Sequence, residues 1–267
     1  MLNVYPINAF QDNYIWCIEN SITKKCIIID PGDEKPVIQH LLANQLTLKA
    51  ILITHHHYDH VDGISGLLTH AQQYSGDTVT VLGPSNSKIK QITQPVVKGD
   101  RLTLLGTTLL VNEVPGHTLD HISYYVAQDL EHPTPWLFCG DTLFSAGCGR
   151  LFEGSPAQML RSLKTLTELP LNTEVYCTHE YTLSNLAFAK AVLPNNPDIK
   201  QHIEKCQTLR DLDQPTLPST IATELKINPF VSCSRSDVQS AVSHHSNLPI
   251  ASELDTFTRL RSWKDSF

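Results

Sequence analysis

Four histidines and one aspartate, whose side chains bind metals or carry protons, are crowded into the stretch Thr54-His55-His56-His57-Tyr58-Asp59-His60. The pattern is T-H-x-H-x-D-H, and it follows the apolar run 49–54, which has the composition of a buried strand. Imidazole and carboxylate are common ligands of divalent metals, and α/β sheets usually place their sites at the C-terminal ends of strands. The stretch therefore predicts a metal site, although its spacing alone does not assign the side chains to one ion.

Three further predicted strands end in a loop that carries a histidine or an aspartate. His117 follows the run 108–114, Asp141 follows 136–139, and His179 follows 174–178. Any one of these residues alone would more readily be structural. Four ligand-bearing loops that emerge from one sheet are hard to attribute to accident, and together they indicate a shared site.

These loops require a sheet to position them, and the apolar patterns predict one. Strands are expected at 2–7, 14–19, 26–30, 49–54, 78–82, 101–105, 108–114, 122–127, 136–139 and 174–178. Helices are expected among them at 34–45, 62–74 and 156–168. Strands mixed with helices are typical of a layered α/β sandwich.

Beyond residue 180 the patterns become helical. Helices are expected at 182–193, 198–212, 220–227, 237–245 and 252–264. We therefore predict a catalytic domain at 1–180 and a small all-helical domain at 181–267.

The composition excludes several classes of protein. The 267 residues carry a net charge of -7 and only 20 Lys and Arg, which argues against binding nucleic acid through its phosphates. No apolar run approaches the roughly 20 residues that span a bilayer, and no export signal opens the chain. The seven cysteines are odd in number and include no CxxC. We expect a cytoplasmic protein without membrane or nucleic-acid partners, with inert thiols.

The motifs THHHYDH, PGHT, GDTLF and THEYT, in this order, resemble those of the metallo-β-lactamase superfamily. Within it, the loop GCGRLFEG at 147–154 and the terminal RSWKD at 261–265 resemble the glyoxalase II (hydroxyacylglutathione hydrolase) family, and the similarity extends over essentially the whole chain. The resemblance implies an αββα sandwich with a small C-terminal all-helical domain. It also implies a monomeric enzyme that hydrolyses S-(R)-lactoylglutathione and related thioesters to glutathione and D-lactate, the second step of methylglyoxal detoxification.

The resemblance also implies two divalent ions, with zinc expected first and iron or manganese as alternatives. One ion would be held by His55, His57, His117 and Asp141. The other would be held by Asp59, His60, His179 and the bridging Asp141. These ligands would fix a metal-bridging hydroxide as the nucleophile, since metal ions lower the pKa of bound water to about 7. Asp59 and Asp141 are therefore the expected catalytic residues.

Glutathione carries carboxylates, so its recognition requires donors and positive charge. The resemblance implies that Arg150, Tyr181, Arg261 and Lys264 bind it. Residues 261 and 264 are three apart and would share a helix face. Phe152 stands where some family members have Tyr, which removes one potential hydrogen bond.

Three alternatives stay open at this point. A mononuclear iron persulfide dioxygenase of the same fold would act on a related glutathione substrate, but the complete second ligand set favours the hydrolase. A nuclease of the superfamily is disfavoured by the acidic balance. A non-enzymatic metal-binding protein would have to explain an intact ligand set without chemistry.

The remaining histidines and turn residues are given ordinary roles. We expect His56 and Tyr58 to support or pack against the ligands, and the sequence leaves a supporting role for His121 open. Asp30 and Asp33, in the sequence DPGD, are expected to serve a turn. Six histidines are expected to be bystanders: His40, His70, His132, His202, His244 and His245.

Overall fold

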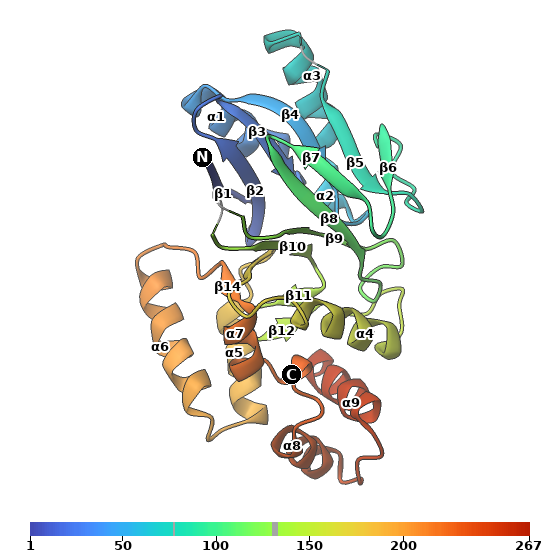
Figure 1. Cartoon of the computed structure of the whole chain (residues 1–267). Coiled ribbons are helices and arrows are strands. Elements are labelled where there is room, and N and C mark those ends of the chain that lie inside the picture. The colour runs from blue at the N-terminus through green and yellow to red at the C-terminus, as the bar shows by residue number, and fades with distance from the viewer. Residues whose placement is uncertain (77, 130–132) are drawn as a thin grey trace. The chain divides into compact units, whose positions relative to one another are not determined.

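A computed structural model describes residues 1–76, 78–129 and 133–267. The chain forms two compact units, which the colours of Figure 1 help to follow along the sequence. Unit 1 comprises Met1–Glu113 and Asp120–Gly140, and unit 2 comprises Val114–Leu119 and Asp141–Phe267. The units divide the fold by its internal contacts, whereas the domain boundary near residue 180 stays a prediction.

Unit 1 contains two sheets and three helices in its described part. In chain order its elements are β1 (Leu2–Ala9), β2 (Asn13–Asn20), β3 (Lys25–Ile29), α1 (Glu34–Asn44), β4 (Thr47–Leu52), α2 (Tyr58–Val61), α3 (Ile64–Tyr74), β5 (Thr80–Pro84), β6 (Gln94–Val96), β7 (Arg101–Leu104), β8 (Thr107–Glu113), β9 (Ile122–Val126) and β10 (Trp136–Gly140).

The first sheet has the strand order β1-β2-β3-β4-β5-β6. Its first three strands are antiparallel, and β3, β4, β5 and β6 run parallel. Parallel neighbours need a long crossover connection, which α1 supplies between β3 and β4 and α3 supplies between β4 and β5. The sheet therefore places β4 between two parallel neighbours. The C-terminal end of β4 leads into residues 54–60, which we call the histidine-rich loop.

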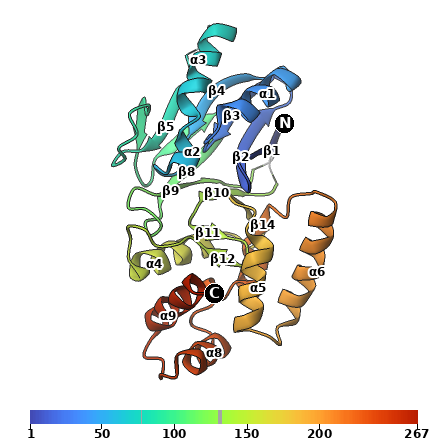
Figure 2. The same ribbon diagram turned by 180° about the vertical axis from the view of Figure 1, so that it is seen from behind.

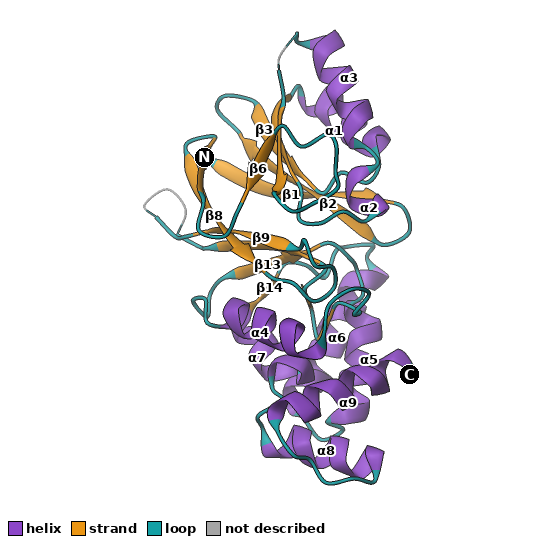
Figure 3. Ribbon diagram, turned by 90° about the vertical axis from the view of Figure 1, so that its right-hand side faces the viewer, coloured by secondary structure: helices purple, strands orange, loops and turns teal. Residues whose placement is uncertain are grey.

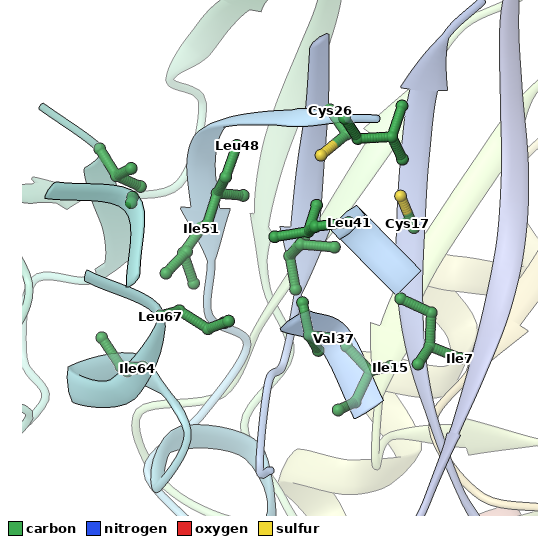
Figure 4. Close-up of a cluster of buried hydrophobic side chains, with 14 of the residues drawn as sticks. Ile7, Ile15, Cys17, Cys26, Val37, Leu41, Leu48, Ile51, Ile64 and Leu67 are labelled. Atoms are coloured by element: carbon green, nitrogen blue, oxygen red, sulfur yellow. The ribbon is translucent and has the colours of Figure 1, made fainter. Parts of the chain in front are cut away.

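Helices α1 and α3 cover one face of this sheet (Figures 1 and 2). Their apolar side chains, such as Val37, Leu41 and Leu67, pack with Ile15 and Ile51 of the strands (Figure 4). Complete burial of each such side chain is worth about 1.5–3 kcal/mol. This layer holds β4 rigidly, which fixes the point where the loop after it begins.

The second sheet of unit 1 contains the antiparallel strands β10-β9-β8-β7. Tyr124 of β9 donates its buried hydroxyl to the carbonyl of Ile53, at 2.8 Å, just beyond β4. The amide of Ile122 donates to the carbonyl of Thr54 in the same way. These bonds join the second sheet to the first at the origin of the histidine-rich loop.

Unit 2 is mostly helical, as the purple ribbons of Figure 3 show for its long helices. Its elements are β11 (Leu143–Phe144), β12 (Gly147–Cys148), α4 (Pro156–Thr167), β13 (Glu174–Cys177), α5 (Thr182–Val192), α6 (Pro197–Asp211), β14 (Ser219–Thr220), α7 (Ile221–Ile227), the 3-10 turn η1 (Pro229–Val231), α8 (Ser236–Ser246) and α9 (Glu253–Asp265).

The strands of unit 2 are short, and aromatic side chains form much of its core. β11 and β12 pair as an antiparallel hairpin, and β13 pairs with β14. Phe230 of η1 packs against Phe188 of α5 and Phe257 of α9, with ring centroids 5.8 and 5.9 Å apart. This core holds three separate segments of the C-terminal region together.

The predicted helices and long strands are present, with shifts of a few residues at their ends. The expected helix 62–74 begins at Ile64, and the short α2 precedes it. The short elements β6, β11, β12 and β14 were not predicted, because two or three residues carry no detectable periodicity. No helix among the described residues is both long and apolar enough to cross a membrane.

Candidate metal centre

The histidine-rich loop of unit 1 gathers three imidazoles. The ring centroid of His55 lies 4.8 Å from that of His57 and 4.1 Å from that of His60. His57 is the extended residue that caps α2, and the next turn carries Asp59 and His60. The metal-binding atoms of His55 and His57, of His55 and His60, and of Asp59 and His60 lie within 4.8 Å of one another in each pair. Unit 1 thus brings together all four predicted ligands of this loop.

A buried carboxylate, that of Asp30, supports the loop. Its two oxygens accept hydrogen bonds from Thr54, one from the amide at 2.8 Å and one from Oγ1 at 2.7 Å. The second oxygen also lies 3.0 Å from Nδ1 of His60. Thr54 Oγ1 lies 3.0 Å from Nδ1 of His55. Asp30 is therefore connected to two of the predicted ligands, one directly and one through Thr54.

This arrangement differs from the expectation that DPGD only makes a turn. Asp33 does have that role, since its side chain accepts from the Lys35 amide at the start of α1. Asp30 instead lies beside His60, where a carboxylate next to Nδ1 favours the tautomer that leaves Nε2 free to ligate. Periodicity could not reveal this contact, because Asp30 and His60 are remote in the sequence and are brought together by tertiary contacts such as the pairing of β3 with β4.

Asp59 has a partner that the sequence analysis also missed. The side-chain amide of Asn13, at the buried start of β2, donates to Asp59 Oδ2 at 3.1 Å. The same oxygen lies 3.6 Å from Nε2 of His60. Asn13 therefore helps to orient the carboxylate of Asp59.

In unit 2 the other three predicted ligands meet at one oxygen. Nε2 of His117 lies 3.4 Å from Asp141 Oδ2, and Nε2 of His179 lies 3.3 Å from the same oxygen. All three residues are buried. Two imidazole nitrogens that converge on one carboxylate oxygen form a donor set suited to a divalent cation.

The ring of His117 is oriented from its opposite side. Its Nδ1 lies 2.8 Å from the backbone carbonyl of Arg150, an acceptor that favours a proton on Nδ1. Nε2 is then left as the lone-pair donor that faces Asp141. The ring of Phe152 packs edge-on against the same imidazole, with centroids 5.3 Å apart.

Two glycines permit close approach of the backbone near the ligands. Gly140 has φ +47°, and a Cβ there would lie 2.4 Å from Thr54 Oγ1. A Cβ on Gly149 would lie 1.9 Å from the backbone oxygen of Asp141. Any side chain at Gly149 would displace the segment that carries Asp141.

The neighbours of the ligands have separate roles. Nδ1 of His56 lies 2.9 Å from Asp120 Oδ1, and Ser87 donates to the other oxygen of that carboxylate at 2.7 Å. His121 stacks on His55, a predicted ligand, with ring centroids 4.5 Å apart. Tyr58 is exposed. His132 lies outside the described residues.

The predicted substrate-binding residues Arg150 and Tyr181 present accessible side chains. The Arg150 side chain is 65% exposed, and its guanidinium carbon lies 5.8 Å from the centre of the Phe152 ring. The Tyr181 ring stacks parallel to that of His179, with centroids 4.6 Å apart. The Tyr181 side chain is therefore next to a predicted ligand of unit 2, whereas the Arg150 side chain lies beside Phe152, whose ring packs against His117.

Arg261 and Lys264 lie one helical turn apart in α9, as predicted, but their environments differ. Arg261 is buried, and its Nη1 donates to the carbonyl of Cys148 at 3.0 Å. Lys264 is half-buried, with Nζ 5.2 Å from the centre of the Phe188 ring, and this burial lowers the pKa of its ammonium group. Lys264 is thus the more accessible cation of the two.

The donor set in each unit fits divalent metal ions. Imidazole nitrogens and carboxylate oxygens are ligands that zinc, iron and manganese accept. The seven cysteines are all buried and free, and none belongs to the groups of side chains placed to hold a metal. The ligand chemistry is therefore of the His/Asp type that the sequence predicted.

Comparisons with known proteins agree with this geometry. A family model described as "Metallo-beta-lactamase superfamily" matches residues 11–179, and one described as "Hydroxyacylglutathione hydrolase C-terminus" matches residues 180–267. The chain is 50% identical to the hydroxyacylglutathione hydrolase of Shewanella baltica (strain OS223) and 48% identical to that of Hahella chejuensis, with both chains of each pair covered completely.

Solved structures show the same fold at lower identity. The crystal structure of ETHE1 from Myxococcus xanthus has a TM-score of 0.63 and 23% identity and covers 99% of each chain. At this identity the similarity concerns the fold alone. The fold is the metallo-β-lactamase α/β architecture, with a helical C-terminal region added to it.

Proposed function

The chain belongs to the hydroxyacylglutathione hydrolase (glyoxalase II) family of the metallo-β-lactamase superfamily, and we propose that it hydrolyses S-(R)-lactoylglutathione to glutathione and D-lactate. Identity near 50% along the entire length of both chains carries this proposal, because the match includes the helical C-terminal region as well as the catalytic fold. The reaction would be the second step of methylglyoxal detoxification.

We further propose that two divalent ions occupy the site, with zinc first and iron or manganese as alternatives. His55 and His57 would act with His117 and Asp141 on one ion. Asp59 and His60 would act with His179 on the other, and Asp141 would bridge the two. The proposal is supported within unit 1 by the grouped imidazoles and within unit 2 by the convergence of two imidazoles on Asp141 Oδ2.

The chain's own residues prepare these donors. When bound, such ions lower the pKa of water and polarise the thioester carbonyl. Asp30 and the Arg150 carbonyl orient His60 and His117, so that Nε2 of each ring is the donor. Asn13 holds the carboxylate of Asp59. Fixed donors need little rearrangement during the reaction, which is how preorganised polar groups contribute to catalysis.

The proposed reaction requires no strong proton donor, because the leaving group is a thiolate. A thiol has a pKa near about 8.5, so a thiolate leaves at neutral pH with far less protonation than an amine requires. The chain therefore needs neither a Ser-His-Asp triad nor a dedicated general acid for this reaction. Its main tasks are to hold the thioester and to position the ligands.

We propose that the glutathionyl part binds through Arg150, Tyr181, Arg261 and Lys264. Arg150 and Lys264 supply accessible positive charge for carboxylates, and Tyr181 supplies a hydroxyl beside His179. Arg261 would contribute its charge from a buried position while it holds the loop at Cys148. The expected partner is therefore a small anionic thioester.

We also propose that the protein is a monomer of the cytoplasm. Seven free cysteines, all buried, are compatible with a reducing compartment. The net charge of -7 supports the view that nucleic acid is not a partner.

The decisive experiment is a thioesterase assay on protein whose metal content has been measured. We expect S-lactoylglutathione to be cleaved at least 100-fold more efficiently than acyl-CoA thioesters. A preference for acyl-CoA would be consistent with thioester hydrolysis but would contradict the proposed glutathione substrate. Oxygen uptake with glutathione persulfide, without thioester cleavage, would overturn the proposed reaction.

A further inference from the structure

A fully buried carboxylate lies in unit 2 and takes no part in the ligand set described above. Glu224 of α7 is 0% exposed, and no cation is seen among its hydrogen-bond donors in the described chain. One oxygen accepts from the hydroxyl of Ser219. The other accepts from the backbone amide of Ala146 at 2.8 Å and from the side-chain amide of Asn228 at 3.0 Å. A buried charge is costly unless its hydrogen bonds compensate for it, so these contacts require an explanation.

Ala146, whose amide donates to Glu224, has an unusual backbone conformation. Ala146 is the last residue before β12, and its φ is +55°. A residue with a Cβ is strained in this left-handed region, so the surrounding structure must impose the conformation. The carboxylate of Glu224 is the acceptor for the amide of this strained residue. Glu224 therefore helps to hold the turn between β11 and β12.

Other C-terminal side chains hold the same hairpin. Asn228 donates to the carbonyls of Phe144, at 3.1 Å, and of Gly147, at 2.8 Å. Asn185 of α5 donates to the carbonyl of Ser145 at 3.1 Å. Arg261 of α9 donates to the carbonyl of Cys148. Side chains that follow residue 180 thus form a hydrogen bond with the hairpin backbone at every residue from 144 to 148.

The hairpin lies between Asp141, a predicted metal ligand, and Arg150, whose carbonyl contacts the predicted ligand His117. Asp141 precedes β11 by two residues, and the amide of Gly149 donates back to the carbonyl of Thr142 at 3.1 Å. Arg150, two residues after β12, provides the carbonyl that faces Nδ1 of His117 at 2.8 Å. A displacement of the hairpin would therefore move the base of Asp141 and the group that orients His117.

We propose that Glu224 is a positioning residue for the metal centre, which acts through the hairpin β11–β12 on Asp141 and His117. The helical C-terminal region then has two tasks: it contributes substrate contacts, and it holds a ligand-bearing loop of the catalytic fold. The inference relies on the proposed function only in taking Asp141 and His117 as metal ligands.

The test uses substitutions that separate hydrogen bonding from packing. Glu224→Gln keeps the shape, and its amide can accept from Ala146 and Asn228 while it donates to Ser219. Glu224→Leu fills a similar volume but accepts nothing. Val242→Ala, in the buried face of α8, is the matched control, since it weakens the core of unit 2 without touching the hairpin.

Two readouts are independent of catalysis. The first is zinc affinity, measured by competition with a chelator, for which we expect a loss of about 10–100-fold in Glu224→Leu and less than threefold in Glu224→Gln. The second is hydrogen exchange of the Ala146 amide in the zinc-loaded protein, which should be faster only in Glu224→Leu. Val242→Ala should lower the melting temperature and leave both readouts near those of the wild type.

Equal zinc affinity in Glu224→Leu and the wild type would overturn the proposal, as would an equal loss in Val242→Ala. If Glu224→Leu does not fold, Asn185→Ala removes a single bond to the hairpin and should lower zinc affinity by severalfold, and an unchanged affinity would count against the proposal. A wild type that cleaves no glutathione thioester would refute the proposed function alone, because zinc affinity and amide exchange would still report on the hairpin.

Discussion

The carboxylate of Asp30 lies 3.0 Å from Nδ1 of His60, although the two residues are thirty positions apart in the chain. The same carboxylate accepts two hydrogen bonds from Thr54, which itself lies beside His55. Asp30 has φ +53°, a left-handed conformation that costs free energy and is maintained by these contacts. The buried carboxylate of Asp30 thus helps to orient the histidine-rich loop.

Replacement of Asp30 should weaken metal binding more than it weakens folding. In Asp30→Asn, one amide nitrogen replaces an acceptor oxygen, so either Thr54 or His60 loses its partner. We expect zinc affinity to fall by about 10–100-fold, the usual cost of removing a group that orients a ligand. Asp33→Asn is the control, because Asn caps a helix as well as Asp does. Zinc affinity equal to that of the wild type in Asp30→Asn would contradict this role.

Asp141→Asn should abolish most of the activity, since both His117 and His179 face the oxygen that the substitution changes or displaces. Hydrolysis of S-lactoylglutathione is expected to fall by at least 100-fold, on the order of the loss of one key electrostatic group. Bound metal should decrease in parallel when it is measured by elemental analysis. Asp213→Asn, at an exposed position two residues after the end of α6, should change neither quantity. Wild-type activity and metal content in Asp141→Asn would refute the dinuclear assignment.

Arg150→Ala should raise KM more than it lowers kcat, because we propose that its exposed guanidinium, which lies 3.9 Å from Asp265 Oδ1, binds the substrate and not the reacting atoms. Loss of one charge-assisted bond corresponds to about a tenfold increase in KM. Arg150→Lys should recover part of this loss, as it keeps the charge but not the planar geometry. Steady-state kinetics at low salt provide the measurement, with Lys205→Ala as an exposed control. An unchanged KM would exclude Arg150 from the binding site.

The cysteines should be unreactive in the native protein. Burial raises the pKa of the Cys206 thiol to about 11 and also raises that of Cys148. The reactive species is the thiolate, so at neutral pH these thiols are both protonated and covered, and reactivity should increase only as pH rises toward the raised pKa values. Titration with a coloured disulfide reagent at pH 7 should detect no rapidly reacting thiol in the folded protein and all seven after denaturation. A thiol that reacts rapidly in the native protein would contradict the burial of all seven cysteines.

The loops that carry the seven proposed metal ligands were predictable because their polar residues follow apolar runs, whereas the assignment of these side chains to two ions came from the resemblance to the family. Burial of a run such as 49–54 leaves the residues after it at the edge of a sheet, which is a local property of the sequence. Asp30 was not predictable in the same way, because DPGD satisfies the pattern of a turn whether or not its first carboxylate reaches a histidine.

Glu224 illustrates a signal that was present but ambiguous. It occupies the position between Ile221 and Ile227 on the buried face of α7, three residues from each. A glutamate on an apolar stripe is a departure from helical patterning, yet Glu is also common on exposed faces of helices. The hairpin that Glu224 contacts could not be predicted from the sequence, since strands of two residues have no periodicity.

By itself, the sequence determined the fold class and the long elements, and its resemblance to the family supplied the seven proposed metal-binding side chains. The fold class and the long elements depend on local composition and periodicity, because burial of apolar surface stabilises a helix or a strand according to the spacing of its apolar residues. Only the tertiary structure decided which groups orient those ligands: Asp30 on His60, Asn13 on Asp59, the Arg150 carbonyl on His117 and Glu224 on the hairpin. Such contacts join residues remote in sequence, and a hydrogen bond depends on distance and direction, which exist only after the chain has packed.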